Sequence, residues 1–293
     1  MLLDAHGGAA ADAFTWKVSG GRVLGPAPFM VMGIVNVTPD SFSDGGLHFD
    51  PAHAASHGSD LVSEGAAIID VGGESTRPFA DPVPEDEEAR RVIPVIEAVA
   101  AFRPEAAVSV DTCKAGVADR ALRAGAAIVN DVSAFSLDPG LPDVLAQHKP
   151  GYVLMHSQGS PKTMQVEPRY GDVLAEITAF FEERMTMLVR AGLPEDRIVL
   201  DPGIGFGKTQ DHNLAILRGL AAFASLGRPL LIGLSRKSFL GRILGPGVSD
   251  DPAGRGPATM VATAISYLYG ASIHRVHRVA EAVQALTLAR ALR

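Results

Sequence analysis

Short apolar runs recur along the chain, and longer stretches with apolar residues at helical spacing lie between them. An apolar run without polar alternation is typical of a strand buried on both faces of a parallel sheet. The expected strands are residues 29–35, 67–71, 107–110, 126–129, 151–155, 198–200, 229–234 and 272–275. The expected helices are residues 51–64, 85–102, 114–124, 141–147, 172–191, 212–220, 257–269 and 278–292.

This alternation gives eight strand–helix units, joined by connections short enough for right-handed crossovers. Eight parallel strands in a chain of 293 residues predict an α/β protein with a (β/α)8 TIM barrel. Residues 14–24 carry turn chemistry between two β-capable pieces and predict a short N-terminal β-hairpin. A doubly wound open sheet is the alternative, although no Gly-x-Gly-x-x-Gly pattern follows the first strand to support a dinucleotide site.

The composition narrows the class of protein. Hydrophobic residues make up 47% of the chain, which excludes a disordered chain, and a net charge of −7 disfavours nucleic acid as a partner. No apolar run reaches the length of a membrane span, and the N-terminus has no basic segment of a signal peptide, so we expect a cytoplasmic protein without a membrane partner. The single cysteine, Cys113, excludes an intrachain disulfide. We expect a flexible tail over residues 1–13 and one domain over residues 14–293.

Several predicted strands end in a polar residue, at the edge where TIM barrels place their active sites. Between residues 198 and 208 an aliphatic run leads into Asp201, and Pro202 and a glycine-rich turn follow. If the barrel forms, one mouth collects Asn36, Asp111, Asn130, Asp201, Ser235, Lys237, Arg275 and His277.

Three of these residues suit a flat polar ring. Asp111, Asn130 and Asp201 carry short carboxylate or amide groups, and a carboxylate matches the two adjacent N–H donors of an aminopyrimidinone edge. Lys237 is suited to a ring carbonyl or nitrogen. Apolar faces for the ring are available from Met155 and Phe206. Taken singly, an acid after a strand is more often a helix cap and Asn130-Asp131 is more often a turn, but their recurrence on successive strand ends favours a site.

Other residues of the mouth suit an anion. Arg275 and His277 are two residues apart and so lie on the same side of a strand. With Ser235 and Lys237 near a helix start, they fit a phosphorylated or carboxylated ligand. The oxygen of Asn36 suits Mg²⁺, with water completing its coordination. An ordinary helix-start histidine is the alternative for His277.

Eight motifs, in order along the chain, resemble the dihydropteroate synthase family of pterin-binding enzymes. They are residues 32–46, 70–78, 109–112, 129–133, 154–156, 201–208, 235–238 and 275–277. The resemblance implies a TIM barrel that is usually a homodimer and a transferase of folate biosynthesis that sulfonamides target. Such an enzyme joins 6-hydroxymethyl-7,8-dihydropterin diphosphate to p-aminobenzoate, giving 7,8-dihydropteroate and pyrophosphate. It uses Mg²⁺-assisted loss of diphosphate and attack of the aryl amine on a pterin cation.

The resemblance also implies roles for individual residues. The pterin ring would be held by Asp111, Asn130, Asp201 and Lys237. Asn36 would bind Mg²⁺, and Arg275 and His277 would take the diphosphate. The loops that carry Phe42, Asp44, Thr76 and Arg77 would close over p-aminobenzoate together with Phe206 and Ser235. We expect these loops, residues 38–46 and 73–81, to be mobile without ligand.

The chain departs from the family pattern at three places. Phe79 stands where the family has Gly, Ser157 where it has Met, and Arg278 where it has Asp. Arg278 either adds positive charge beside the diphosphate region or merely begins a helix. Two alternatives remain open: a degenerate paralogue that binds pterin and regulates or scaffolds a partner, and a pterin-dependent methyltransferase that serves a corrinoid protein. The methyltransferase has no use for a diphosphate site.

Overall fold

The computed structural model describes residues 13–38, 50–75, 81–159, 168–245, 247–248 and 252–293. The predictions for the N-terminal tail and for the loop residues Phe42, Asp44, Thr76, Arg77 and Phe79 fall outside these residues. The expected mobility of the two loops therefore stays a prediction. Within the described residues, no helix is long and apolar enough to cross a membrane.

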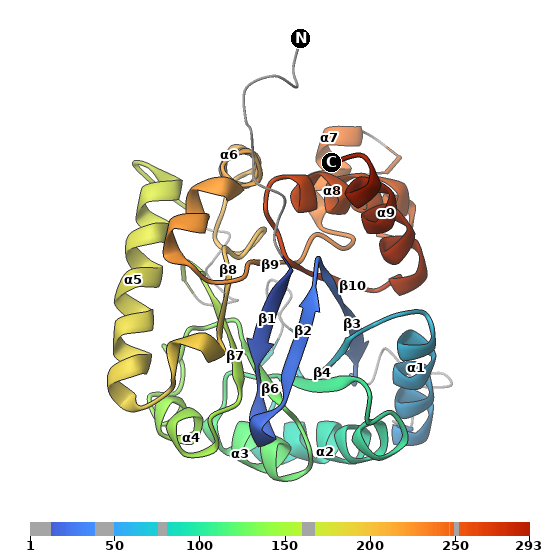
Figure 1. Ribbon diagram of the computed structural model, residues 1–293, viewed down its shortest axis with the longest axis vertical. Coiled ribbons are helices and arrows are strands. Elements are labelled where there is room, and N and C mark those ends of the chain that lie inside the picture. Colours follow the sequence, from blue (N-terminus) through green and yellow to red (C-terminus); the bar gives the residue numbers. More distant parts are fainter. Residues whose placement is uncertain (1–12, 39–49, 76–80, 160–167, 246, 249–251) are drawn as a thin grey trace.

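A ring of helices surrounds a sheet of parallel strands (Figure 1). The strands are β3 (Met30–Asn36), β4 (Ile68–Gly72), β5 (Ala107–Asp111), β6 (Ile128–Asp131), β7 (Gly151–Met155), β8 (Ile198–Asp201), β9 (Leu231–Ile232) and β10 (Ile273–Val276). The helices are α1 (Pro51–Ser63), α2 (Glu85–Phe102), α3 (Ala115–Arg123), α4 (Leu141–His148), α5 (Val173–Ala191), α6 (Gln210–Arg218), α7 (Ser238–Leu244), α8 (Gly256–Leu268) and α9 (Val279–Ala291).

The sheet curves until its two edge strands meet. Its strand order is β8-β7-β6-β5-β4-β3-β10-β9. Neighbouring strands are therefore consecutive in the sequence, except that β3, the first strand of this sheet, pairs with β10, the last. Leu200 of β8 forms a parallel bridge to Leu230, beside β9, and the Leu200 amide donates to the Pro229 carbonyl at 3.0 Å. The sheet is therefore a nearly closed barrel. The predicted TIM barrel is confirmed, and the open doubly wound sheet is wrong.

Two elements differ from the sequence prediction. The apolar run 229–234 forms a ladder only over Leu231 and Ile232, although Leu230 and Leu234 are also buried. Pro229 accepts from Leu200 but has no N–H to donate, which limits the ladder at this end. The seven-residue helix α7 was not among the expected helices, because a segment this short has no sustained apolar periodicity. Helix α2 has its expected bounds, and four acidic residues form its first turn.

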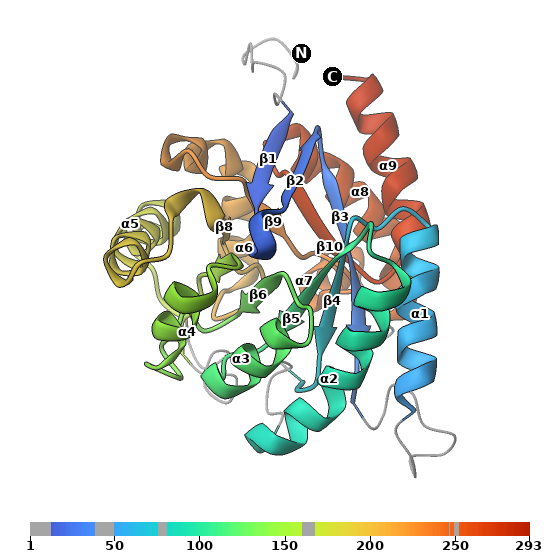
Figure 2. The ribbon, with the colours of Figure 1, turned by 60° about the horizontal axis from the view of Figure 1, so that its bottom comes forward.

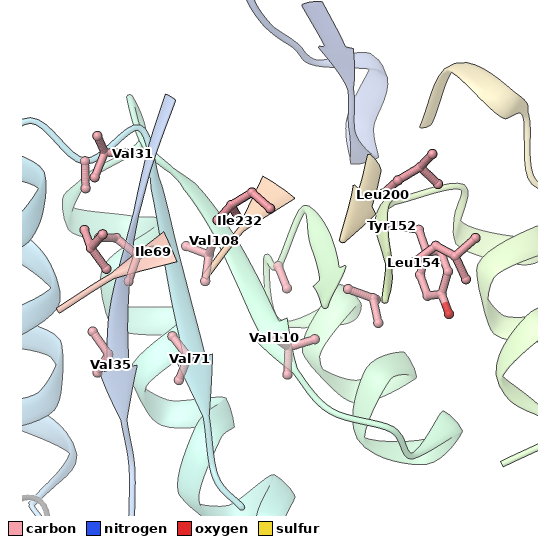
Figure 3. Close-up of a cluster of buried hydrophobic side chains, with 14 of the residues drawn as sticks. Val31, Val35, Ile69, Val71, Val108, Val110, Tyr152, Leu154, Leu200 and Ile232 are labelled. Atoms are coloured by element: carbon pink, nitrogen blue, oxygen red, sulfur yellow. The ribbon is translucent and has the colours of Figure 1, made fainter. Parts of the chain in front are cut away.

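The strands bury both of their faces, as their continuous apolar runs predicted. Outward-facing residues pack against the helices, and Figure 3 shows several of them, among them Val35, Val71 and Val110. The alternate residues point into the barrel and form a second apolar cluster. Its members on the strands include Met32, Ile68, Ile128, Val153, Val199 and Ile273. Successive side chains of a strand point to opposite faces, so one run supplies both cores.

An antiparallel hairpin fills one end of the barrel. It consists of β1 (Phe14–Lys17) and β2 (Val23–Ala27) and confirms the predicted N-terminal hairpin. Figure 2 shows the hairpin at the end from which β3 and β4 begin. Trp16 and Val18 are fully buried in the inner cluster, and the Trp16 Nε1 donates to the Arg197 carbonyl at 2.8 Å. A Cβ at Gly151 would lie 2.8 Å from Val18 and 2.9 Å from Trp16, so only glycine allows β7 to begin there.

The Trp16→Ala variant should lose about 3–5 kcal/mol of unfolding free energy, because it opens a cavity at the buried end of the barrel and removes a hydrogen bond. Urea denaturation followed by circular dichroism measures this loss. Phe102→Ala is the matched control, since Phe102 is 75% exposed, and it should change stability by no more than about 0.5 kcal/mol. Equal losses in the two variants would contradict the proposed packing.

Candidate functional site

The barrel's inward-facing residues change from apolar to polar toward the carboxyl ends of the strands. Stepping by two residues from the inner apolar cluster keeps to the inner face of each strand. On β3, two such steps from Met32 lead to Asn36. From Ile273 of β10, one step leads to Arg275 and a second leads to His277. The polar or sulfur-containing residues reached in this way are Asn36, Asp70, Ser109, Asp111, Asn130, Met155, Asp201, Ser235, Arg275 and His277. They end at the face where TIM barrels carry their active sites.

Arg275 links two acids that lie on other strands. Its Nε donates to Asp70 Oδ2 at 2.6 Å, and its Nη2 donates to Asp111 Oδ2 at 2.7 Å. Asp70 is completely buried and Asp111 is 8% exposed, while Arg275 reaches the surface of the mouth. Burying an acid is costly unless it is paired, so the arginine stabilises both carboxylates.

Asp70 also contacts Asn130. The Asn130 Nδ2 donates to Asp70 Oδ2 at 3.0 Å, in a fully buried contact. A carboxylate only accepts hydrogen bonds, so it fixes which end of the amide faces it. Asp70 was not among the predicted site residues, although it lies on the inner face of β4, two residues before the strand ends at Gly72. That position was the signal that could have found it.

Burial shifts the pKa values of the charged groups in the mouth. It raises the pKa of Asp111 to about 7, against the opposing effect of Arg275. Burial also raises the pKa of Asp201, while Lys237 and the Gly203 amide act to lower it. The pKa of the Lys237 ammonium falls to about 8, again mainly through burial. Several titratable groups with perturbed pKa values in one concave region are typical of an active site.

The turn after Asp201 needs its glycines. Asp201 Oδ1 accepts from the Gly203 amide at 2.7 Å, and Gly203 has φ +67°. A Cβ there would lie 1.9 Å from the His156 carbonyl oxygen. Lys208 closes the turn, because its Nζ donates to the carbonyls of His156 and Phe206 at 3.2 and 2.9 Å. Burial lowers the pKa of Lys208 to about 7.

A second turn brings Lys237 to the mouth. Arg236 has a left-handed backbone with φ +59°, which is unfavourable for a residue with a Cβ. Arg255 Nη1 holds this turn by donating to the Arg236 carbonyl at 2.8 Å. The Lys237 Nζ donates to the Ile204 carbonyl and lies 4.6 Å from the centre of the Phe206 ring. The structure thus brings Lys237 and Phe206 together, beside Asp201.

Ser235 and His277 also meet. Ser235 Oγ lies 2.8 Å from His277 Nδ1 and accepts from the His277 backbone amide at 3.3 Å. Met155 is buried and is the register partner of Asp201 on the neighbouring strand. Arg278 is exposed, and it pairs with Glu281 of its own helix at 2.9 Å. The arrangement favours a helix-start role for Arg278 over an added charge at the mouth.

Asn36 offers one hard oxygen ligand at the end of β3, where it is partly exposed. No group of three or more His, Cys, Asp or Glu side chains suited to a metal occurs in the described part of the chain. A single amide oxygen does not make a protein-only metal cage. It does fit Mg²⁺, which is often bound by one or two protein oxygens together with substrate phosphates and water.

The start of the second loop is anchored by charge. Lys114 is ion-paired with both Glu74 and Glu88, and Glu74 Oε2 also accepts from the Val83 amide at 3.2 Å. Burial raises the pKa of Glu88, while Lys114 opposes this shift. Glu74 therefore ties together the two sides of the segment in which Thr76 and Arg77 lie.

Comparisons with known proteins agree with this geometry. The model of the pterin binding enzyme family matches residues 32–277. The chain is 46% identical to dihydropteroate synthase from Escherichia coli K12 over 261 residues, which are 89% of this chain and 90% of the relative. The Yersinia pestis dihydropteroate synthase in a sulfonamide drug complex superposes with a TM-score of 0.87 at 42% identity, covering 94% of this chain and 98% of that one.

The Xanthomonas albilineans dihydropteroate synthase with 4-aminobenzoic acid also has a TM-score of 0.87, at 43% identity over 95% of this chain and 98% of that one. These matches extend through both the apolar barrel and its polar mouth. The chain belongs to the dihydropteroate synthase family of pterin-binding enzymes.

Proposed function

We propose that this protein is a dihydropteroate synthase, a transferase that condenses 6-hydroxymethyl-7,8-dihydropterin diphosphate with p-aminobenzoate. The products are 7,8-dihydropteroate and pyrophosphate. The observation that carries the proposal is the single inward-facing layer of Asp111, Asn130, Asp201 and Arg275. The layer occurs in a chain that is 46% identical to a dihydropteroate synthase over 89% of its length. The pair Ser235–His277 extends this layer.

The acids and the amide hold the pterin. Asp201 accepts the two adjacent N–H donors of the aminopyrimidinone edge, and Asp111 and Asn130 accept from the remaining ring N–H groups. Lys237 donates to a ring carbonyl or nitrogen, and Met155 and Phe206 provide apolar faces. The electrostatic effect of Asp201 and Lys237 on each other supports these roles. Lys237 acts to lower the pKa of Asp201, and Asp201 acts to raise the pKa of Lys237, so each favours the charged form of the other.

The cationic and polar residues at the rim take the diphosphate. Arg275 has N–H groups beyond those bound to Asp70 and Asp111, and a guanidinium is suited to phosphate oxygens. His277, oriented by Ser235, adds a second donor. Asn36 would hold Mg²⁺ together with the diphosphate oxygens. When bound, Mg²⁺ neutralises negative charge on the departing diphosphate.

Bond breaking precedes bond making in the proposed reaction. The C–O bond between the pterin methylene and the diphosphate breaks, and its electron pair leaves with pyrophosphate. The carboxylates of Asp111 and Asp201 stabilise the cation that remains on the conjugated pterin. The amine nitrogen of p-aminobenzoate then bonds to the methylene carbon and gives up a proton to water. No protein nucleophile is needed.

The p-aminobenzoate pocket lies on the outer side of the pterin in this proposal. Phe206 and Ser235 form its inner part, and the loop residues Phe42, Asp44, Thr76 and Arg77 are proposed to complete it. The ion pairs of Glu74 and Lys114 support a defined start for the second of these loops.

We also propose a homodimer in the cytoplasm. Helix α8 carries Val261, Ile265 and Leu268 on its surface, and their spacing of four and three residues forms one apolar stripe. Helix α9 packs beside it and exposes Leu288. A second copy of the chain would cover this stripe, because a two-fold interface brings the same patch of both subunits together. One cysteine in the whole chain suits a reducing compartment.

The proposed function predicts release of pyrophosphate from the pterin diphosphate only when Mg²⁺ and p-aminobenzoate are both present. A coupled phosphate assay measures this release, and a sulfonamide should inhibit it by competing with p-aminobenzoate. Binding of the pterin diphosphate without release would indicate the degenerate paralogue instead.

The Asp201→Asn variant should lower kcat/KM by about two orders of magnitude or more, because a buried ring edge loses its charged acceptor.

The rate should have a bell-shaped dependence on pH. Asp111 must be a carboxylate to accept a ring N–H, so kcat/KM should fall as pH drops through about 7, the pKa raised by burial. Lys237 must be protonated to donate, so kcat/KM should also fall above its lowered pKa of about 8. Initial rates at subsaturating pterin diphosphate measure both limbs. Lys237→Arg should move the alkaline limb upward, and an unchanged limb would remove Lys237 from this role.

The double variant Val261→Glu, Ile265→Glu should convert the dimer to a monomer, because four buried charges would face one another across the two-fold axis. Light scattering after gel filtration measures the mass. Val23→Glu places a charge on the exposed hairpin, and this control should leave the dimer intact. A dimer that survives the double variant would place the interface elsewhere.

A further inference from the structure

We propose that Asp70 is a positioning residue that sets both the Arg275 guanidinium and the Asn130 amide for ligand binding. The inference deepens the proposed function and rests on it. A single oxygen, Asp70 Oδ2, accepts from Arg275 Nε at 2.6 Å and from Asn130 Nδ2 at 3.0 Å. One carboxylate thus connects the residue proposed for the diphosphate with a residue proposed for the ring.

The contact with Arg275 fixes the direction of the guanidinium. Bonds to Asp70 through Nε and to Asp111 through Nη2 hold two sides of this planar group. The N–H groups that remain belong to the two terminal nitrogens, Nη1 and Nη2. Without Asp70, Nε has no fixed partner, and the group would rotate about its last bonds. An anion would then have to order it on binding.

The contact with Asn130 fixes the polarity of the amide. Because Asp70 only accepts, the nitrogen of Asn130 must face it, and the Asn130 oxygen faces away from it. An amide held in this way presents an acceptor to the ligand. A ring N–H would be favoured over a ring carbonyl at this position, so Asp70 would contribute to the choice of ligand through Asn130.

The burial of Asp70 suggests that its charge is kept for more than folding. Asp70 is fully buried, and its Oδ1 has no hydrogen-bond partner among the residues that the structure describes. A buried acceptor without a partner destabilises a fold. By contrast, Asp131 on β6, two strands away from β4, is equally buried but on the outer face, and it accepts from Ser133, Phe135 and Tyr152. Asp131 has the contacts of a structural acid, and Asp70 has those of a residue held for the site.

Asp70→Asn tests the inference, because it preserves shape and removes the acceptor-only character. Isothermal titration would use two probes: 6-hydroxymethylpterin for the amide, and pyrophosphate with Mg²⁺ for the guanidinium. We expect both affinities to fall by about tenfold or more. In the Arg275→Lys background the same change should weaken pyrophosphate binding by less than about threefold, because its effect acts through Arg275.

Asp131→Asn is the matched control for loss of a buried acid. It should lower the melting temperature and leave both affinities within about threefold of the wild type. Wild-type affinities in Asp70→Asn, or a full loss that persists in the Arg275→Lys background, would overturn the inference. If the wild-type protein binds neither probe, the proposed function fails instead, so the two failures are distinguishable.

A measurement on the unmodified protein covers the case in which Asp70→Asn does not fold. With ¹⁵N-labelled arginine, the Arg275 Nε–H resonance is identified by its loss in Arg275→Lys. We expect this proton to stay protected from solvent exchange with and without pyrophosphate, because Asp70 holds it in both states. Fast exchange in either state would contradict a fixed guanidinium.

Discussion

The alternation of side chains along a closed parallel sheet is the constraint on which this structure depends. Each strand places every second residue in a space that it shares with all the other strands. Near the strand starts this space holds Met32, Ile68 and Val199, and near the strand ends it holds Asp70, Asp111 and Asp201. The barrel therefore brings together side chains from distant parts of the chain. A shift of one residue in β4, β5 or β8 would turn the acid outward and could place Val71, Val110 or Leu200 inward instead.

Pairing of opposite charges makes this polar layer tolerable. Three acids, Asp70, Asp111 and Asp201, are matched by Arg275, Lys208 and Lys237, so the described part of the mouth is close to neutral. Ions in such a place are stabilised by one another rather than by water. The same arrangement suits a ligand that becomes positive at its ring while negative charge leaves, because fixed charges of both signs already face the two parts and need no reorganisation.

Much of the fold could be predicted because its signals are local. Helix α2 begins at an acidic turn, and strands such as β3 and β7 are dominated by apolar runs. The strand at 229–234 was predicted but the short length of β9 was not, because a ladder depends on neighbours as well as on hydrophobicity. The positions of Asp111, Asp201 and Arg275 followed from the strand ends. The contact of Asp70 with Arg275 did not, because 205 residues separate them and the sequence carries no sign of the pairing. The sequence left open whether Arg278 adds charge at the mouth or begins a helix, and its pairing with Glu281 favours the helix start.

The hairpin at the base of the barrel determines from which end ligands can enter. Trp16 and Val18 occupy the end where the strands begin, so in the described part of the chain that end offers no passage. A ligand of the barrel must therefore enter and leave at the opposite end, where the strands terminate. In the proposed function, a pterin seated against Asp201 would lie beneath p-aminobenzoate at Ser235 and Phe206. The pterin would then have to bind first, and the joined product would leave past the same rim.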